Sequence, residues 1–295
     1  MLNIELPTTF ALAKRIVNRL GYGAMQLSGP GVFGPPKDHA NAVAVLREAV
    51  ERGVNHIDTS DFYGPHVTNQ IIREALRPYP EGLLIVTKVG AKRGSLGSVH
   101  PAMSREDITQ AVHDNLRNLG VEVLDVVNMR SMLRNDGPAD GSLEAPLTVL
   151  ADLQREGLVR HIGLSNVTPA EVVEGRKICE IVCIQNLYNV LQRDDDTLID
   201  ELATAGIAYV PYFPLGGMGL PESATLLAVA RVEATPMQVA LAWLLLRSPN
   251  ILPIPGTASL AHLRENLTAA ALDLPPSEIE LLDGIVPRCG GVKQD

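Results

Sequence analysis

Residues able to assist proton transfer stand at or just beyond the ends of two successive apolar runs. Asp58 and Tyr63 belong to the string DTSDFYG over residues 58–64, and Lys88 directly follows the apolar run 83–87. A lysine ammonium beside a phenol stabilises the phenolate, and an aspartate beside the lysine holds the ammonium in place. We therefore expect Tyr63 to give a proton to a carbonyl oxygen as hydride reaches the carbon, and to take it back in the reverse reaction.

Such a site requires a fold that brings strand ends together. Six short apolar runs, separated by helix-like segments, each end on a polar residue: Asp58, Lys88, Arg130, Ser165, Gln185 and Tyr212. In a (β/α)₈ barrel the carboxyl ends of the strands surround one mouth, where barrel enzymes place their active sites. The sequence therefore predicts that these six residues share one pocket.

Eight apolar runs with helical segments between them predict the barrel itself. We expect the strands at residues 20–23, 54–57, 83–87, 123–129, 159–164, 181–184, 207–210 and 251–254. No change of composition marks a linker, so residues 1–295 are expected to form one α/β domain, a (β/α)₈ TIM barrel. A doubly wound sheet would normally show G-x-G-x-x-G after its first strand. Here Gly21 and Gly23 are followed by Gln26 where the third glycine would stand.

Composition narrows the possible partners. The 295 residues are 46% hydrophobic and 20% charged, and the net charge is −9, so neither a nucleic acid nor an anionic membrane is an expected partner. The three cysteines show no metal-ligand pattern, and no metal site is expected. We find no secretory signal and no apolar stretch of membrane-spanning length. These observations predict a cytoplasmic protein, either a monomer or a weak homo-oligomer.

Six motifs in this order resemble those of the aldo-keto reductases, and the resemblance extends over almost the whole chain. They are DTSDFYG (58–64), VTK (86–88), IGLSN (162–166), QNLYN (185–189), YFPLG (212–216) and IPGT (254–257) with EN (265–266). The resemblance implies that Tyr63 is the proton donor, Lys88 its activator and Asp58 the partner of Lys88. It also implies a small-molecule carbonyl substrate and NADPH/NADP+ as cofactor, with NADH possible.

The resemblance further implies a cofactor site. Ser165, Asn166 and Gln185 would bind the nicotinamide carboxamide, and Tyr212 would stack on the ring. The remaining candidates would contact the pyrophosphate, the adenine or other parts of the cofactor: Gly23, Met25, Phe213, Pro214, Leu215, Gly216, Gly217, Gly256, Thr257, His262, Glu265 and Asn266.

The sequence departs from the family pattern at two places. Arg130 stands where the family usually has a histidine; because arginine stays charged, we expect it to position substrate by hydrogen bonding and not to shuttle protons. Gly256 and His262 stand where many members carry a lysine and an arginine for the ribose phosphate of NADPH. Thr257, Ser259, Arg264 or helix N–H groups could substitute.

The substrate prediction also comes from resemblance. The string NMR at 128–130, together with IPGT, resembles a bacterial branch that includes pyridoxal reductases, which makes reduction of pyridoxal to pyridoxine the favoured activity. A sugar or secondary-metabolite ketoreductase, and a nicotinamide-sensing regulatory subunit with little turnover, are the alternatives. Phe33, His66 and Arg93 are expected on loops that overhang the mouth, and His56 is expected to be structural.

Overall fold

Parallel strands form most of a ring. The computed structural model describes residues 8–133, 139, 141–216, 224–230 and 234–285. Hydrogen bonds join the strands side by side in the order of the chain. The strands are β3 (Tyr22–Gly23), β4 (His56–Asp58), β5 (Leu84–Arg93), β7 (Leu124–Arg130), β8 (Val159–Ser165), β9 (Ile181–Gln185) and β10 (Ala208–Tyr209). The register pairs Arg130 with Ser165 and Ser165 with Gln185, so three predicted site residues end adjacent strands.

The ring closes through residues 250–255, where the sequence predicted the eighth strand. On one side Leu252 N–H donates to the Tyr209 carbonyl at 2.8 Å, and on the other Gly21 N–H donates to the Pro253 carbonyl at 2.9 Å. The segment forms only an isolated bridge, Tyr209 to Ile251, and no regular strand. Pro253 and Pro255 cause this difference because proline has no backbone N–H to contribute to a ladder. The closed ring agrees with the predicted (β/α)₈ barrel.

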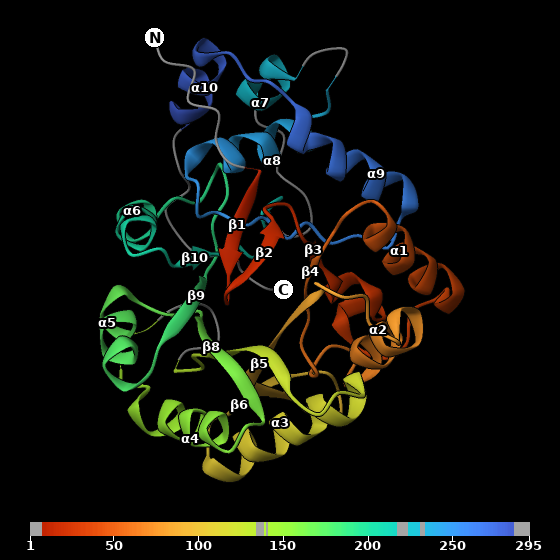
Figure 1. Cartoon of the computed structure of the whole chain (residues 1–295). Coiled ribbons are helices and arrows are strands. Elements are labelled where there is room, and N and C mark those ends of the chain that lie inside the picture. The colour runs from red at the N-terminus through yellow and green to blue at the C-terminus, as the bar shows by residue number, and fades with distance from the viewer. Residues whose placement is uncertain (1–7, 134–138, 140, 217–223, 231–233, 286–295) are drawn as a thin grey trace.

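Helices surround this ring of strands (Figure 1). The α-helices are α1 (His39–Glu51), α2 (Val67–Leu76), α3 (Arg105–Leu119), α4 (Glu144–Arg155), α5 (Pro169–Ile178), α6 (Asp196–Thr204), α7 (Ala224–Val229), α8 (Pro236–Arg247), α9 (Leu260–Thr268) and α10 (Pro276–Asp283), with short 3₁₀ turns η1 (Ala24–Leu27), η2 (Pro30–Val32) and η3 (Ala269–Ala271). The string SRED at 104–107 predicts a helix cap, and the structure has it at the start of α3: the Ser104 hydroxyl accepts from Asp107 N–H, and Gly120 ends the helix with φ +68°.

The barrel interior is a separate apolar core that lies beneath the predicted mouth. A hairpin of β1 (Thr9–Leu12) and β2 (Arg15–Asn18) closes one end of the ring (Figure 1). Its side chains join a buried cluster with interior residues of the strands: Leu12, Ala13, Val17, Leu84, Val86, Val126, Cys183, Ala208, Val210, Leu252 and Ile254. Side chains on one face of a strand recur every second residue. Lys88 therefore points to the barrel interior like Val86, and Gln185 like Cys183, one layer above this core.

One strand extends beyond the barrel. The sequence predicted Arg93 on a loop that overhangs the mouth, but β5 continues to Arg93 and pairs antiparallel with β6 (Val99–Ala102). Gly90, with φ +104°, permits the extension because a Cβ there would lie 2.4 Å from the Arg130 carbonyl oxygen. Arg93 therefore belongs to a strand of a hairpin, and the prediction that it lies on a loop is wrong.

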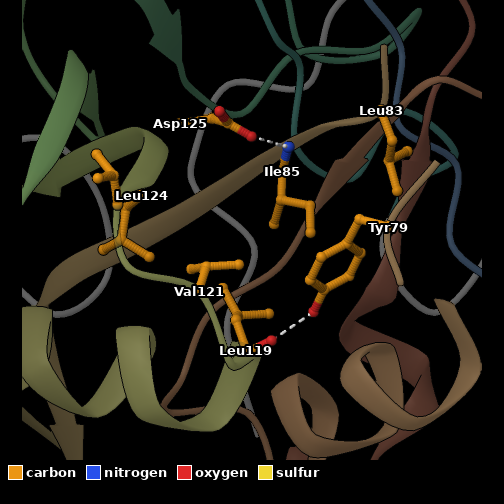
Figure 2. A pocket seen from close by; sticks show the side chains of 8 residues that line it. Tyr79, Leu83, Ile85, Leu119, Val121, Leu124 and Asp125 are labelled. Carbon is orange, nitrogen blue, oxygen red and sulfur yellow. Dashed lines mark hydrogen bonds between the residues drawn. The ribbon is translucent and has the colours of Figure 1, made fainter. Parts of the chain in front are cut away.

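Two cavities lie away from the predicted site residues. Figure 2 shows one of about 50 Å³, bounded by the first residues of β5 and β7 and the end of α3, where the Tyr79 hydroxyl donates to the Leu119 carbonyl at 2.6 Å. The other, about 460 Å³, lies beside the β1–β2 turn and is lined by Lys14, His161 and Glu180 among others. Within the described part of the chain, no helix combines the length and apolar character needed to cross a membrane.

Candidate active site

The centre of the mouth is a buried ion pair between neighbouring strands. Lys88 Nζ donates to Asp58 Oδ1 at 2.5 Å and to the Thr59 carbonyl at 2.9 Å. The two side chains are only 4% and 6% exposed. Burial acts to lower the pKa of Lys88, but the attraction of Asp58 and Tyr63 outweighs it and the net pKa is raised. Lys88 therefore remains an ammonium group at neutral pH.

Tyr63 lies beside this ammonium group. Lys88 Nζ is 5.4 Å from the centroid of the Tyr63 ring, and Tyr63 is itself buried, with 7% exposure. Its backbone N–H donates to the Ser60 carbonyl at 3.0 Å, which forms a tight turn. The Phe62 ring packs on it with centroids 4.9 Å apart. The loop after β4 thus holds the phenol, the lysine and Asp58 together, as the sequence predicted for their positions.

Asp61 fixes the shape of that loop. Its carboxylate accepts from His66 Nδ1 at 2.6 Å, from Asn69 at 3.0 Å and from Asn118 at 3.0 Å. These bonds tie the loop to α2 and α3. The hydrogen bond that His66 donates to Asp61 is the main cause of a raised pKa at His66. The sequence indicated no role for Asp61, because its partner Asn118 lies 57 residues further along the chain.

Gln185 connects the ion pair to strands on the other side of the barrel. Its Nε2 donates to Asp58 Oδ2 at 2.9 Å, and its Oε1 accepts from Asn128 Nδ2 at 3.3 Å. Cys183 donates its thiol hydrogen to Asn128 Oδ1 at 3.2 Å. Each oxygen of Asp58 therefore has a different partner. The sequence placed Gln185 at the mouth but did not indicate its bond to Asp58.

Ser165 and Asn166 differ in how their polar groups are satisfied. Asn166, at φ +60°, donates to the Ser131 carbonyl at 2.9 Å and accepts from the Tyr212 hydroxyl at 3.3 Å. The Ser165 hydroxyl is fully buried and has no partner among the described residues. Buried polar groups are normally hydrogen-bonded. The Ser165 hydroxyl, unlike the Asn166 amide, is therefore available to hydrogen-bond a ligand.

Arg130 stands at the end of β7, as predicted, with Asn128 buried deeper on the same face. Its Nε donates to the sulfur of Met132 at 3.3 Å, a weak acceptor. No carboxylate pairs with Arg130 within the described ranges. Burial raises the pKa of the Tyr212 hydroxyl, and the charge of Arg130 opposes that effect.

The segment after β10 has an unusual backbone. Tyr212 packs edge-on against Phe213, with ring centroids 5.5 Å apart. Phe213 has φ +51° and Gly216 φ +75°, and Gly216 N–H donates to the Phe213 carbonyl at 2.9 Å. Pro214 is buried and Leu215 half-buried. Gly217 lies outside the described residues.

Two glycines lie where the first strand meets the segment that closes the barrel. A Cβ on Gly23 would lie 2.5 Å from the Ile254 carbonyl oxygen, and one on Gly256 would lie 2.4 Å from the Gly23 carbonyl oxygen. Thr257 accepts through its carbonyl from the Tyr22 hydroxyl at 2.6 Å. Met25 is half-buried in η1. The close backbone contact explains why both positions require glycine.

Helix α9 carries the last predicted contacts. His262 is exposed in its first turn and Asn266 is buried. Glu265 accepts from the Thr235 hydroxyl at 2.5 Å. Arg264 had been considered for the ribose phosphate of NADPH, but its guanidinium donates twice to Glu48 of α1, at 2.6 and 2.9 Å. Spacing alone could not show this competition, because Glu48 lies more than 200 residues earlier.

Comparisons with known proteins agree with this arrangement. The sequence model of the Aldo/keto reductase family matches residues 19–287. The chain is 66% identical to the pyridoxine 4-dehydrogenase of Escherichia coli over 94% of this chain and 98% of that protein. It is 36% identical to an uncharacterised oxidoreductase of Schizosaccharomyces pombe, over 93% and 89% of the two chains.

Solved structures give the same result. A thermostable aldo-keto reductase in complex with the inhibitor epalrestat has 30% identity and a TM-score of 0.79, covering 93% of this chain and 98% of that one. An aldo-keto reductase from Klebsiella pneumoniae in complex with NADPH has 22% identity and a TM-score of 0.78, covering 95% of each chain. This chain belongs to the aldo/keto reductase family. It is an oxidoreductase that acts on carbonyl or alcohol groups.

Proposed function

We propose that this protein reduces an aldehyde to an alcohol with NADPH, and that pyridoxal is its substrate and pyridoxine its product. The structural observation that carries the proposal is the buried Lys88–Asp58 pair beside Tyr63 at the barrel mouth. The 66% identity to a pyridoxine 4-dehydrogenase supports the choice of substrate. In the reverse direction the same site would oxidise the alcohol.

The cofactor fits the residues present. The unpartnered buried hydroxyl of Ser165 offers a hydrogen bond to a carboxamide, and Asn166 and Gln185 lie on neighbouring strand ends. Tyr212 would stack on the nicotinamide. The rest of the cofactor would lie against Gly216, the paired glycines Gly23 and Gly256, and the start of α9. The NADPH-bound relative from Klebsiella pneumoniae supports the choice of NADPH. When bound, NADPH supplies the hydride.

The protein's own residues manage the proton. Tyr63 donates its hydroxyl proton to the carbonyl oxygen as that oxygen gains negative charge. The Lys88 ammonium then stabilises the phenolate left on Tyr63. Asp58 keeps Lys88 charged and is itself held by Gln185. Arg130 positions the substrate by donating hydrogen bonds and does not exchange protons.

A direct assay tests the substrate. Purified protein with NADPH and pyridoxal should consume the cofactor and form pyridoxine, detected by chromatography. Turnover of a panel of simple aldehydes or sugar ketones without turnover of pyridoxal would reject pyridoxal as the substrate but retain carbonyl reduction. We further propose a cytoplasmic protein that is monomeric or weakly oligomeric; the free thiols Cys179 and Cys183 fit a reducing compartment.

A further inference from the structure

Two arginines stand at the mouth without an anionic partner among the residues that the structure describes. Arg93 is the last residue of β5, and Arg130 is the last residue of β7. No ion pair joins either one to a carboxylate anywhere in the described ranges. By comparison, Lys92 on the same hairpin pairs with Asp107 at 2.8 Å. Two uncompensated guanidinium groups in a half-buried site repel each other unless an anion binds between or beside them.

Arg93 lies against the aromatic ring that packs on Tyr63, and one of its donors has no partner among the described residues. Its Cζ lies 5.5 Å from the centroid of the Phe62 ring, and Phe62 packs on Tyr63. Nη1 donates to the Gly97 carbonyl at 2.5 Å, whereas Nε is buried and has no partner among the described residues. Burial lowers the pKa of Arg93, the interaction with Tyr63 opposes this, and the charge of Arg130 adds to it. Strands β5 and β7, which end in Arg93 and Arg130, are paired neighbours, and a Cβ on Gly90 of β5 would lie 2.4 Å from the Arg130 carbonyl oxygen. With the Phe62 ring between Arg93 and Tyr63, these contacts bring the three residues to one side of the mouth.

We infer that Arg93 and Arg130 together bind an anionic ring oxygen that lies next to the aldehyde of the substrate. The inference rests on the proposed carbonyl reduction. A hydroxylate on the neighbouring ring carbon would lie beside the carbonyl oxygen that Tyr63 protonates, and charge-assisted hydrogen bonds to arginine are strong and directional. Pyridoxal has this arrangement, with a ring hydroxyl next to its aldehyde.

The pairing also has a chemical consequence. A free hydroxylate donates electron density into the ring and makes the aldehyde carbon a poorer hydride acceptor. Hydrogen bonds from two guanidinium groups hold that charge on the oxygen and restore the reactivity of the carbon. No bond to the hydroxylate forms or breaks, so the stoichiometry of the reduction is unchanged. Loss of Arg93 should therefore lower kcat as well as raise KM for such substrates.

The test compares pyridoxal with its methyl ether at the ring hydroxyl, and salicylaldehyde with its methyl ether. The variants are Arg93→Gln, Arg93→Lys and Arg130→Gln, with Lys92→Gln as the control that removes one charge from the same hairpin. We expect the wild type to prefer the free hydroxyl compound in each pair. Arg93→Gln and Arg130→Gln should each lower that preference about 10- to 100-fold, the value of a lost charged hydrogen bond. Arg93→Lys should restore part of it and Lys92→Gln should keep it.

The outcomes separate this inference from the proposed function. If the wild type reduces all four aldehydes without preference, or if Arg93→Gln and Arg130→Gln leave the preference unchanged, the inference is wrong and carbonyl reduction stands. If the wild type reduces none of them, the proposed function fails and the inference fails with it. The phosphate ester of pyridoxal is tested as a further substrate. If Arg93→Gln loses activity on this ester alone, the arginines bind a phosphate, and the inference that they bind a ring hydroxylate is wrong.

Discussion

Gln185 Nε2 donates to Asp58 Oδ2 at 2.9 Å, a bond that joins strands β9 and β4 across the barrel mouth. The other oxygen of Asp58 binds Lys88 at 2.5 Å. A single carboxylate thus holds both the charged lysine and a residue of the proposed nicotinamide site. Asp58 consequently links proton transfer to cofactor binding through direct contacts.

Removing the charge of Asp58 should destabilise the fold as well as the site. Asp58→Asn leaves the buried ammonium of Lys88 without a counter-charge, and breaking a buried pair in this way costs about 3–5 kcal/mol of unfolding free energy. Urea denaturation measures the loss. Asp152→Asn is the control: it removes surface ion pairs with Arg105 and Arg155, which should cost about 1 kcal/mol or less. Equal losses in the two variants would contradict the account of the buried pair.

Ser165→Ala should weaken cofactor binding without weakening the fold. The Ser165 hydroxyl has no partner within the described residues, so its removal breaks no hydrogen bond to any of them. One lost hydrogen bond to the carboxamide should raise the Kd for NADPH about 3- to 10-fold, measured by fluorescence titration. Ser131→Ala is the matched control, because Ser131 donates to Glu171 at 3.0 Å; its loss should appear in stability. Unchanged NADPH affinity in Ser165→Ala would contradict the assignment.

The Asp61–His66 pair predicts a pH-dependent contribution to stability. The pKa of His66 is raised in the folded state, chiefly by its bond to Asp61, so the native state binds the proton more tightly than the unfolded chain. The stabilisation is therefore complete below the unfolded pKa of about 6.5 and is lost as pH rises through the folded pKa.

His66→Asn tests this sign. Asparagine tolerates the positive φ of the position, and the variant should lose more stability at about pH 5 than at about pH 9. The difference should stay below about 1 kcal/mol because the histidine is half exposed. Thermal unfolding at the two pH values provides the measurement. In an Asp61→Asn background the difference should vanish; if it persists there, another group is responsible.

Arg264 should have no part in choosing between NADPH and NADH. Glu48 holds its guanidinium through two hydrogen bonds, and Arg264→Gln should therefore leave the ratio of the two dissociation constants unchanged. Thr257, Ser259 and the N–H groups at the start of α9 then remain the candidates for the ribose phosphate. A selective loss of NADPH affinity in Arg264→Gln would show that the arginine leaves Glu48 when the cofactor binds.

The sequence predicted those parts of the fold that depend on local pattern. Apolar runs ending on polar residues were enough to place Asp58, Lys88 and Ser165 at one end of a barrel, because parallel strands carry their ends to the same edge. The cap at Ser104 was also predictable, since it depends on residues three positions apart. The hydrophobic pattern predicts the first helix at residues 40–52, within one residue of α1, and ends the third at Leu119, where α3 ends.

The features that could not be predicted depend on contacts between residues far apart in the sequence, or on one side chain binding another that was expected to bind the cofactor. Pro253 and Pro255 prevent a regular eighth strand, although the run 251–254 is as apolar as the others. The extension of β5 to Arg93 needs β6 as a partner, which a strand pattern cannot supply. The bond from Gln185 to Asp58 and the capture of Arg264 by Glu48 join residues more than 100 positions apart.

The most direct test of the mechanism is Tyr63→Phe, assayed with NADPH and pyridoxal. The substitution keeps the ring that packs on Phe62 and removes only the hydroxyl that gives the proton. The account predicts that kcat falls about 100- to 10,000-fold, while the Kd for NADPH and the unfolding temperature change little. A variant that reduces pyridoxal as fast as the wild type would contradict the assignment of Tyr63 as proton donor.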